Sequence, residues 1–413
     1  MYQVSRHKTG LTVVTAEMPH MASVSLGIWV SVGGRYEPAA LSGVSHFIEH
    51  LLFKGTRRRS AKQISQDVEG IGGYLNAFTT EEMTCFYSKA RHDRFHELLE
   101  VLMDMFLYST FDPVEIEKER NVIKEELAMY LDQPQHHVQE LLNEILWPDQ
   151  PLGRSLTGTI ETLDGMTRSH LLDFQRRNYV SGGTLVAAAG KLKHEKVVKA
   201  ISAFARHLPL GGRPVFVPIS TLETAPGLKL FTKATEQTQL ALGIRTCSRH
   251  DPRRFALRLL NTVLGENMSS RLFQVLREDH GLAYSVSSSL AFFDDVGALV
   301  ISAGLDTDKL QSALKLAMRE VARLRRTLVG AAELRRARDY LIGQIDLSLE
   351  NTENQIYVLD LSQASCRIFQ LPHCICLVHL KAQHLCCLTH QYVLDLSPMP
   401  CRILQLPHCT CLG

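Results

Sequence analysis

Residues 24–52, VSLGIWVSVGGRYEPAALSGVSHFIEHLL, predict a strand, a tight turn and a helix in direct succession. Gly33 and Gly34 end the strand, and Ser42 or Ser45 is expected to cap the helix. The strand should bury one face, because its apolar side chains alternate with other residues. That face is formed by Val24, Leu26, Ile28, Val30 and Val32.

The helix carries the motif HFIEH, residues 46–50. His46 and His50 are four residues apart, so they lie on the same helix face, one turn apart. Two imidazoles placed in this way can share a divalent metal, most plausibly zinc. Glu49 borders the same face and can take a proton from a metal-bound water, as in the H-x-x-E-H signature of zinc peptidases. The alternative is a surface helix with two solvated histidines.

Length and composition predict an ordinary globular protein of two domains. The chain has 413 residues, and its 45% hydrophobic and 21% charged content is that of a folded chain. A net charge of +2 gives no reason to expect a nucleic acid or an acidic membrane surface as partner. There is no apolar run of spanning length and no apolar signal core at the N-terminus, so we expect a cytoplasmic protein.

Cysteine usage differs between the body of the chain and its tail. Only Cys85 and Cys247 occur in the first 365 residues, and the other eight cysteines lie between Cys366 and Cys411. The body therefore resembles an intracellular protein without a disulfide framework.

The rest of the first half alternates strands and helices. Asp112 followed by Pro113 is a typical helix start, with proline at the first helical position. Strands are predicted at 11–15, 74–79, 84–89 and 185–190, and helices at 61–71, 93–108, 113–131 and 169–178.

The second half repeats this order of elements. Laying 113–131 over 331–349 at a constant offset of 218 aligns Glu126 with Gln344. We therefore expect an α+β fold of two duplicated units, each with a mostly antiparallel sheet faced by helices. The second-half strands are predicted at 238–246, 283–293 and 296–305, and the helices at 253–265, 270–279, 307–326 and 330–350. The predicted domains are 1–210 and 228–355, followed by a tail at 356–413.

A catalytic zinc needs a third protein ligand besides the two histidines. The helix at 113–131 is the expected donor, because it is rich in glutamate: Glu115, Glu117, Glu119, Glu125 and Glu126. Such a charge run is usually a solvated helix face. Spacing alone does not choose among these residues.

Several stretches resemble the pitrilysin (insulinase-like) family of zinc metallopeptidases, over about residues 1 to 355. The branch most similar to this chain is the small type that includes the β subunit of mitochondrial processing peptidase. The stretches occur in the family order. They are HFIEHLLFKGT (46–56), GGYLNAFTTEEMTCFY (72–87), ERNVIKEEL (119–127), PLGRSLTGT (151–159) and SSRLFQVLREDHGLAYSV (269–286).

The resemblance implies one zinc ion per chain, with His46, His50 and Glu126 as ligands. It implies that Glu49 is the general base and that Glu119 supports the site by orienting a ligating imidazole. The implied activity is that of a metalloendopeptidase that hydrolyses short or unfolded peptides by a metal-activated water.

The resemblance also implies residues that contact the substrate. Arg277 and Tyr284 of the second half would stabilise the oxyanion of the tetrahedral intermediate. From the residues alone, Arg277 is a surface charge and Tyr284 a packed strand aromatic. Asn76 and Ala77 lie in the strand that binds extended substrate backbone in relatives.

The second half contains no H-x-x-E-H motif, so it is expected to be a non-catalytic partner half. In larger family members four such units enclose a chamber, and this chain has two. We therefore expect a homodimer or a heterodimer with an inactive paralogue. One alternative function is a non-catalytic peptide-binding or assembly subunit, and another is a purely structural zinc site.

The family pattern stops after about residue 355. YVLDLSQASCRIFQLPHCICL (357–377) is nearly repeated as YVLDLSPMPCRILQLPHCTCL (392–412). The interpretations are a small metal module built on P-H-C-x-C, a redox or lipid-attachment tail, and a non-native extension after a frame change. A non-native extension would leave the second half without its closing helix and strand, and with an unpaired sheet edge.

Overall fold

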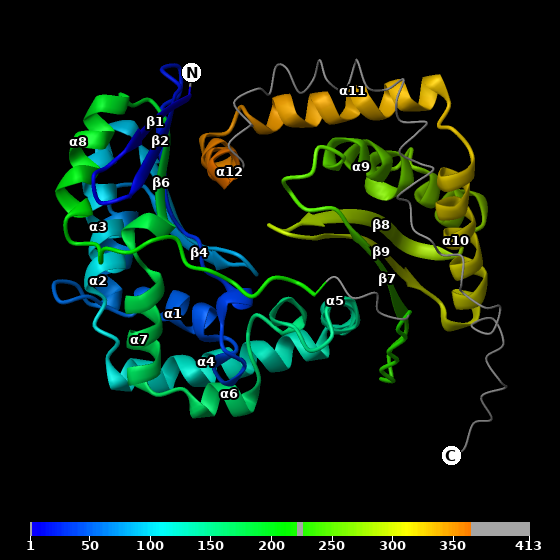
Figure 1. Ribbon diagram of the computed structural model, residues 1–413, viewed down its shortest axis with the longest axis horizontal. Coiled ribbons are helices and arrows are strands. Elements are labelled where there is room, and N and C mark those ends of the chain that lie inside the picture. Colours follow the sequence, from blue (N-terminus) through cyan, green and yellow to red (C-terminus); the bar gives the residue numbers. More distant parts are fainter. Residues whose placement is uncertain (1, 221–225, 365–413) are drawn as a thin grey trace. The chain divides into compact units, whose positions relative to one another are not determined.

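The computed structural model describes residues 2–220 and 226–364, which form two compact units. Unit 1 consists of residues 2–219 and 342–364, and unit 2 lies within residues 220–341. Each unit contains a sheet faced by helices, which confirms the predicted α+β class (Figure 1). The repeats of the tail and its cysteines, from residue 365 onward, lie outside the described residues.

A six-stranded sheet forms the centre of unit 1. Every neighbouring pair of strands is antiparallel except β2 and β6, which are parallel. In their order across the sheet, the strands are β1 (Tyr2–Arg6), β2 (Thr12–Glu17), β6 (Thr184–Gly190), β3 (Ser23–Val30), β5 (Thr84–Arg91) and β4 (Tyr74–Thr79).

Strand β3 shows why the alternation in the sequence was informative. Val24, Leu26 and Ile28 are fully buried in the core formed with the helices, as predicted. Trp29 lies in a second cluster on the opposite face, with Ile356 and Leu359. A central strand is therefore covered on both faces, and burying both of them stabilises the sheet.

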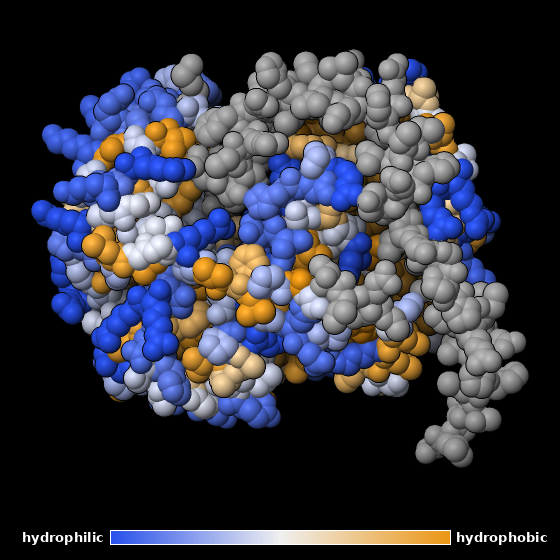
Figure 2. All heavy atoms as spheres, in the orientation of Figure 1, coloured by the Kyte–Doolittle hydropathy of each residue, from blue (hydrophilic) through white to orange (hydrophobic). Residues whose placement is uncertain are grey.

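Helices supply the rest of unit 1. On the face drawn in Figure 2, hydrophobic residues lie in small groups among hydrophilic ones, which fits an apolar core that is inside. The helices are α1 (Val44–Leu52), α2 (Ala61–Glu69), α3 (Phe95–Tyr108), α4 (Pro113–Asp132), α5 (Pro134–Leu146), α6 (Ile160–Gly165), α7 (Arg168–Asn178), α8 (His194–Ala205) and α12 (Thr352–Ala364).

The predicted elements of the first half are confirmed within a few residues. The start of α4 is as expected, because the Val114 N–H donates to Asp112 Oδ1 at 2.8 Å. Strand β1 and helices α5, α6 and α8 were not located from the sequence pattern. Among the described residues, no helix has both the length and the apolarity that crossing a membrane requires.

Unit 2 has a smaller, three-stranded antiparallel sheet. All three strands lie where the sequence predicted them. The strands are, in order, β7 (Thr238–Thr246), β9 (Gly297–Leu305) and β8 (Ala283–Phe292). The helices are α9 (Arg254–Asn261) and α10 (Leu310–Arg326), with π-helical turns at Thr262–Glu266 and Phe273–Asp279. Helix α11 (Ala331–Ser348) begins in unit 2 and ends in residues that belong to unit 1.

The two sheets differ at one edge. In unit 1, β3 lies between β5 and β6, whereas its counterpart β7 pairs only with β9 in the described residues. Residues 227–244, GLKLFTKATEQTQLALGI, resemble residues 10–28, GLTVVTAEMPHMASVSLGI, in their order of apolar and polar side chains. Residues 10–28 contain β2 and most of β3. Yet Leu228 and Leu230 lie in no strand and are 80% and 83% exposed.

Helix α12 spans the residue at which the family pattern is predicted to stop. It runs from Thr352 to Ala364, across residue 355. It belongs to unit 1, where it contacts β2, β3 and β6. The expected domain boundary between 355 and 356 therefore falls inside a helix.

Candidate metal centre

Helix α1 is positioned by a glycine and by a buried carboxylate. Gly43, at the N-terminus of α1, has φ +93°, and a Cβ there would lie 2.6 Å from the Thr157 carbonyl oxygen. Glu37 accepts hydrogen bonds from the backbone N–H groups of Gly43 and Ser45 at 2.7 and 2.8 Å. The expected cap by a serine side chain is therefore wrong, because Glu37 satisfies these donors from a preceding loop.

The burial pattern of α1 leaves both histidines on its less buried side. Phe47, Ile48 and Leu51 point into the core of unit 1 and are almost fully buried. The Nε2 atoms of His46 and His50 lie 3.2 Å apart. Anchoring the apolar face thus brings two imidazole nitrogens to one point.

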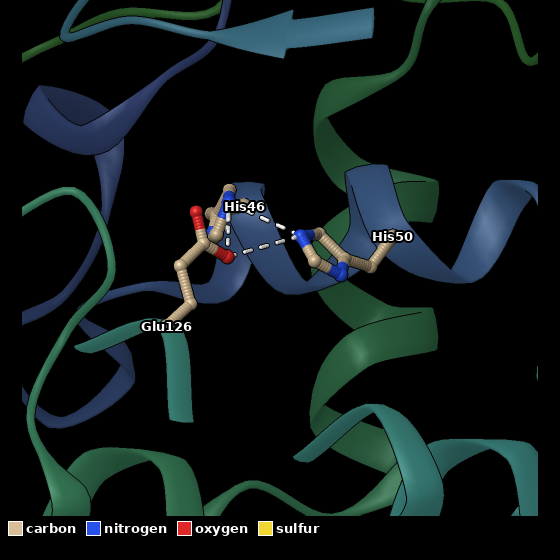
Figure 3. Close-up of side chains that lie close together, drawn as sticks. All are labelled: His46, His50 and Glu126. Carbon is tan, nitrogen blue, oxygen red and sulfur yellow. Dashed lines mark hydrogen bonds and ion pairs between the residues drawn. The ribbon is translucent and has the colours of Figure 1, made fainter. Parts of the chain in front are cut away.

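Glu126 of α4 supplies a third ligand atom at the same point. Its Oε2 lies 3.7 Å from His46 Nε2 and 3.6 Å from His50 Nε2, and all three side chains converge (Figure 3). Two imidazole nitrogens and a carboxylate oxygen within 4.8 Å of one another form a donor set that fits zinc. Within the part of the chain that is described, no other such group of His, Cys, Asp and Glu was found.

The surroundings keep the His46 imidazole in the form that binds metal and orient the His50 imidazole. Burial, together with the charge of His50, lowers the pKa of His46 to about 4, so its imidazole is neutral at neutral pH. Glu119 Oε2 lies 3.1 Å from His50 Nδ1, and its Oε1 lies 2.7 Å from Lys54 Nζ. An Nδ1–H donated to Glu119 leaves His50 Nε2 free to face the ligand point.

Glu49 is half-buried beside the histidines and is held by a threonine. The Thr79 hydroxyl of β4 donates to Glu49 Oε2 at 2.5 Å. Burial raises the pKa of the Glu49 carboxyl, and the hydrogen bond from Thr79 opposes that rise. A carboxylate with a raised pKa suits proton transfer near neutral pH.

The structure also adds residues that the sequence reasoning missed. Tyr130 donates its hydroxyl to Glu126 Oε1 at 2.8 Å, and it lies one turn after Glu126 on α4. That spacing of four residues was a usable signal. Nothing in the sequence pattern indicated the contacts of Thr79 and Lys54, because each depends on packing between distant segments.

The other predicted substrate residues belong to different units. Asn76 is exposed on β4, and its Oδ1 accepts the backbone N–H of Ala77 at 2.8 Å. In unit 2, the guanidinium carbon of Arg277 lies 5.9 Å from the Tyr284 ring centre. Tyr284 is 74% exposed, so its alternative interpretation as a packed strand aromatic is wrong.

Two family sequence models match adjoining parts of this chain. The one described as "Insulinase (Peptidase family M16)" matches residues 12–160, and it includes the converging His46, His50 and Glu126. The one described as "Peptidase M16 inactive domain" matches residues 165–341.

Similar proteins cover most of the chain. An uncharacterized zinc protease of Streptomyces coelicolor is 37% identical over 349 residues, which are 83% of this chain and 76% of the relative. The uncharacterized zinc protease YmxG of Bacillus subtilis is 35% identical over 349 residues, which are 84% of this chain and 85% of the relative.

Solved structures share the fold. A protease from Helicobacter pylori aligns with a TM-score of 0.83 and 20% identity, over 94% of this chain and 96% of that chain. A peptidase M16 inactive domain from Pseudomonas fluorescens aligns with a TM-score of 0.85 and 19% identity, over 91% of each chain.

Proposed function

The chain belongs to the insulinase family of peptidases (family M16), and from this premise we propose that it is a zinc-dependent metalloendopeptidase. Its substrates are short or unfolded peptides. Relatives that are 35–37% identical are named zinc proteases. The observation that carries the proposal is the convergence of His46, His50 and Glu126 next to Glu49.

One zinc ion per chain would be held by His46, His50 and Glu126. Three protein ligands leave a fourth position open, which distinguishes a catalytic site from a structural site closed by four. Zinc bound there supplies Lewis acidity, which lowers the pKa of a water and polarises a peptide carbonyl. Glu119 and Lys54 fix the orientation of the His50 imidazole.

Glu49 moves the proton. It takes a proton from the attacking water and returns it to the amine that leaves when the peptide bond breaks. Because burial raises the pKa of Glu49, the protonated form is accessible in this second step. Thr79 holds the carboxylate in one orientation through its short hydrogen bond.

Strand β4 binds the peptide backbone. It is an end strand of the unit 1 sheet, so one edge carries no partner strand among the described residues. An incoming extended peptide would add to this edge and exchange the bond between Ala77 N–H and Asn76 Oδ1 for one with its own carbonyl. Main-chain recognition favours unfolded substrates over one particular sequence.

The second half contributes to binding rather than to the metal. Arg277 and Tyr284 lie close together in unit 2 and would donate hydrogen bonds to the oxyanion of the intermediate. Two chains would enclose the substrate, either as a homodimer or as a heterodimer with an inactive paralogue.

The second candidate function is a peptide-binding or assembly subunit without turnover. It is favoured by the match of residues 165–341 to a domain described as inactive. The complete set of His46, Glu49, His50 and Glu126 in the first half favours the enzyme, because a subunit without turnover has no need of a general base.

The test compares wild type with Glu49→Gln and with the control Glu125→Gln, which alters an exposed glutamate on α4. We expect one zinc per chain in all three proteins. Cleavage of an unfolded peptide should persist in the control and fall by about 10²–10⁴-fold in Glu49→Gln. Equal cleavage by all three would refute the mechanism, and zinc binding without cleavage in wild type would favour the non-catalytic subunit.

A further inference from the structure

The two carboxylate oxygens of Glu126 have different partners. Oε2 faces the Nε2 atoms of His46 and His50 at 3.7 and 3.6 Å. Oε1 accepts the hydroxyl of Tyr130 at 2.8 Å. A tyrosine keeps its proton at neutral pH, since its ordinary pKa is about 10, so the hydroxyl is the donor.

Tyr130 is itself held in place. It is half-buried near the C-terminal end of α4, where Gln133 ends one helix and Pro134 begins α5. Its ring centre lies 5.5 Å from that of His136, in the first turn of α5. The junction of the two helices therefore places the His136 ring beside Tyr130, whose hydroxyl reaches Glu126.

This arrangement restricts the conformational freedom of the Glu126 side chain, the third ligand. A glutamate side chain has three rotatable bonds, and an unrestrained carboxylate would present either oxygen to the imidazoles. With Oε1 engaged by a neutral donor, Oε2 alone is directed to the ligand point. Hydrogen bonds of this kind orient metal ligands, and their loss weakens metal binding.

We propose that Tyr130 is a positioning residue that sets the zinc affinity of the site by fixing the Glu126 carboxylate. The inference rests on the proposed function only in taking zinc as the metal. It deepens that function by identifying a residue that tunes the site without touching the metal.

The experiment measures the zinc dissociation constant of purified full-length chain by competition with a chromophoric chelator. Tyr130→Phe removes only the hydroxyl, and we expect the dissociation constant to rise about 10–100-fold. The control is Tyr108→Phe on α3, whose hydroxyl is not part of the ligand set, and it should bind zinc as wild type does. Thermal unfolding of the metal-free proteins should be the same for all three.

A double mutant separates positioning from a general structural role. If Tyr130 acts through Glu126, adding Tyr130→Phe to Glu126→Ala, which leaves no acceptor for the hydroxyl, should weaken zinc binding no further. A similar additional loss in that background, or a wild-type dissociation constant in Tyr130→Phe, would overturn the inference. Failure of the wild type to bind zinc would instead overturn the proposed function, so the two failures are distinguishable.

Discussion

Replacing Glu37 with glutamine should make unit 1 less sensitive to rising pH. Glu37 is buried, and its carboxylate accepts the backbone N–H groups of Gly43 and Ser45 at the start of the helix that carries both histidines. Burial raises the pKa of Glu37 to about 7, although these hydrogen bonds and the charge of Arg154 favour the ionised form. Glutamine keeps the shape of the side chain and removes the titration.

The magnitude follows from the difference between the folded and unfolded pKa values. The folded value of about 7 lies above the ordinary value of 4.5, so ionisation is harder in the folded chain. The folded state therefore loses stability as pH rises from about 4.5 to 7. Each unit of pKa corresponds to about 1.4 kcal/mol, so we expect a loss of about 2–3 kcal/mol between pH 5 and pH 8. The glutamine variant does not lose stability in this way, because glutamine does not titrate. It has one acceptor oxygen fewer for the N–H groups of Gly43 and Ser45, which costs about 1–3 kcal/mol at every pH.

The assay is urea unfolding followed by tryptophan fluorescence, with chelator present so that metal binding does not contribute. Both tryptophans of the chain, Trp29 and Trp147, are buried in unit 1, so their fluorescence reports the unfolding of that unit. The difference in unfolding free energy between Glu37→Gln and wild type should shift by about 2–3 kcal/mol in favour of the variant between pH 5 and pH 8.

The control is Glu125→Gln, which removes an exposed carboxylate and should leave the pH dependence of unfolding as in wild type. The reasoning would be refuted if Glu37→Gln and wild type lost stability in parallel over this pH range. In that case the carboxylate at the start of α1 would be ionised without cost in the folded chain.

Three further predictions concern the metal centre. Glu119→Gln should raise the zinc dissociation constant about 10–100-fold, because the His50 imidazole loses a charged acceptor, and an unchanged constant in chelator competition would contradict this. Thr79→Val should lower kcat and move the acid limb of the kcat/KM profile to higher pH. The reason is that the hydrogen bond lost in this variant favours the ionised form of Glu49, so a shift of the acid limb to lower pH would contradict the prediction. Gly43→Ala should destabilise unit 1 by at least about 2 kcal/mol in urea unfolding. An alanine is strained at φ +93°, and its Cβ would press on the Thr157 carbonyl oxygen. If the variant unfolded at the same urea concentration as wild type, α1 would be able to shift without cost.

Local patterns predicted most of the secondary structure. The strand of alternating residues before Gly33 and the start of α4 at Asp112 needed only neighbouring residues, and the structure confirms both. What local patterns did not give depends on partners that are distant in sequence. Glu37 rather than a serine satisfies the start of α1. Helix α12 follows unit 2 in the chain and packs on the unit 1 sheet.

The third ligand illustrates the same limit at the site. Spacing left five glutamates on α4 open, and only the family resemblance singled out Glu126. In the structure, Glu125 is exposed, Glu119 is buried against His50, and Glu126 faces both imidazoles. The difference between these neighbours comes from how α4 packs against α1, which no local pattern records.

The order of residues was enough to predict a helix with two histidines one turn apart and a carboxylate beside them, because helical geometry converts a spacing of four into a shared face. It was also enough to predict the duplicated order of elements. The folded chain was needed to show which oxygen of Glu126 faces the histidines, which residue holds it, and which threonine restrains Glu49. Those contacts join segments 30 to 80 residues apart or depend on the junction of two helices. They follow from how helices and strands pack, because a contact needs two side chains that are close in space and point toward each other, whatever their spacing in the sequence.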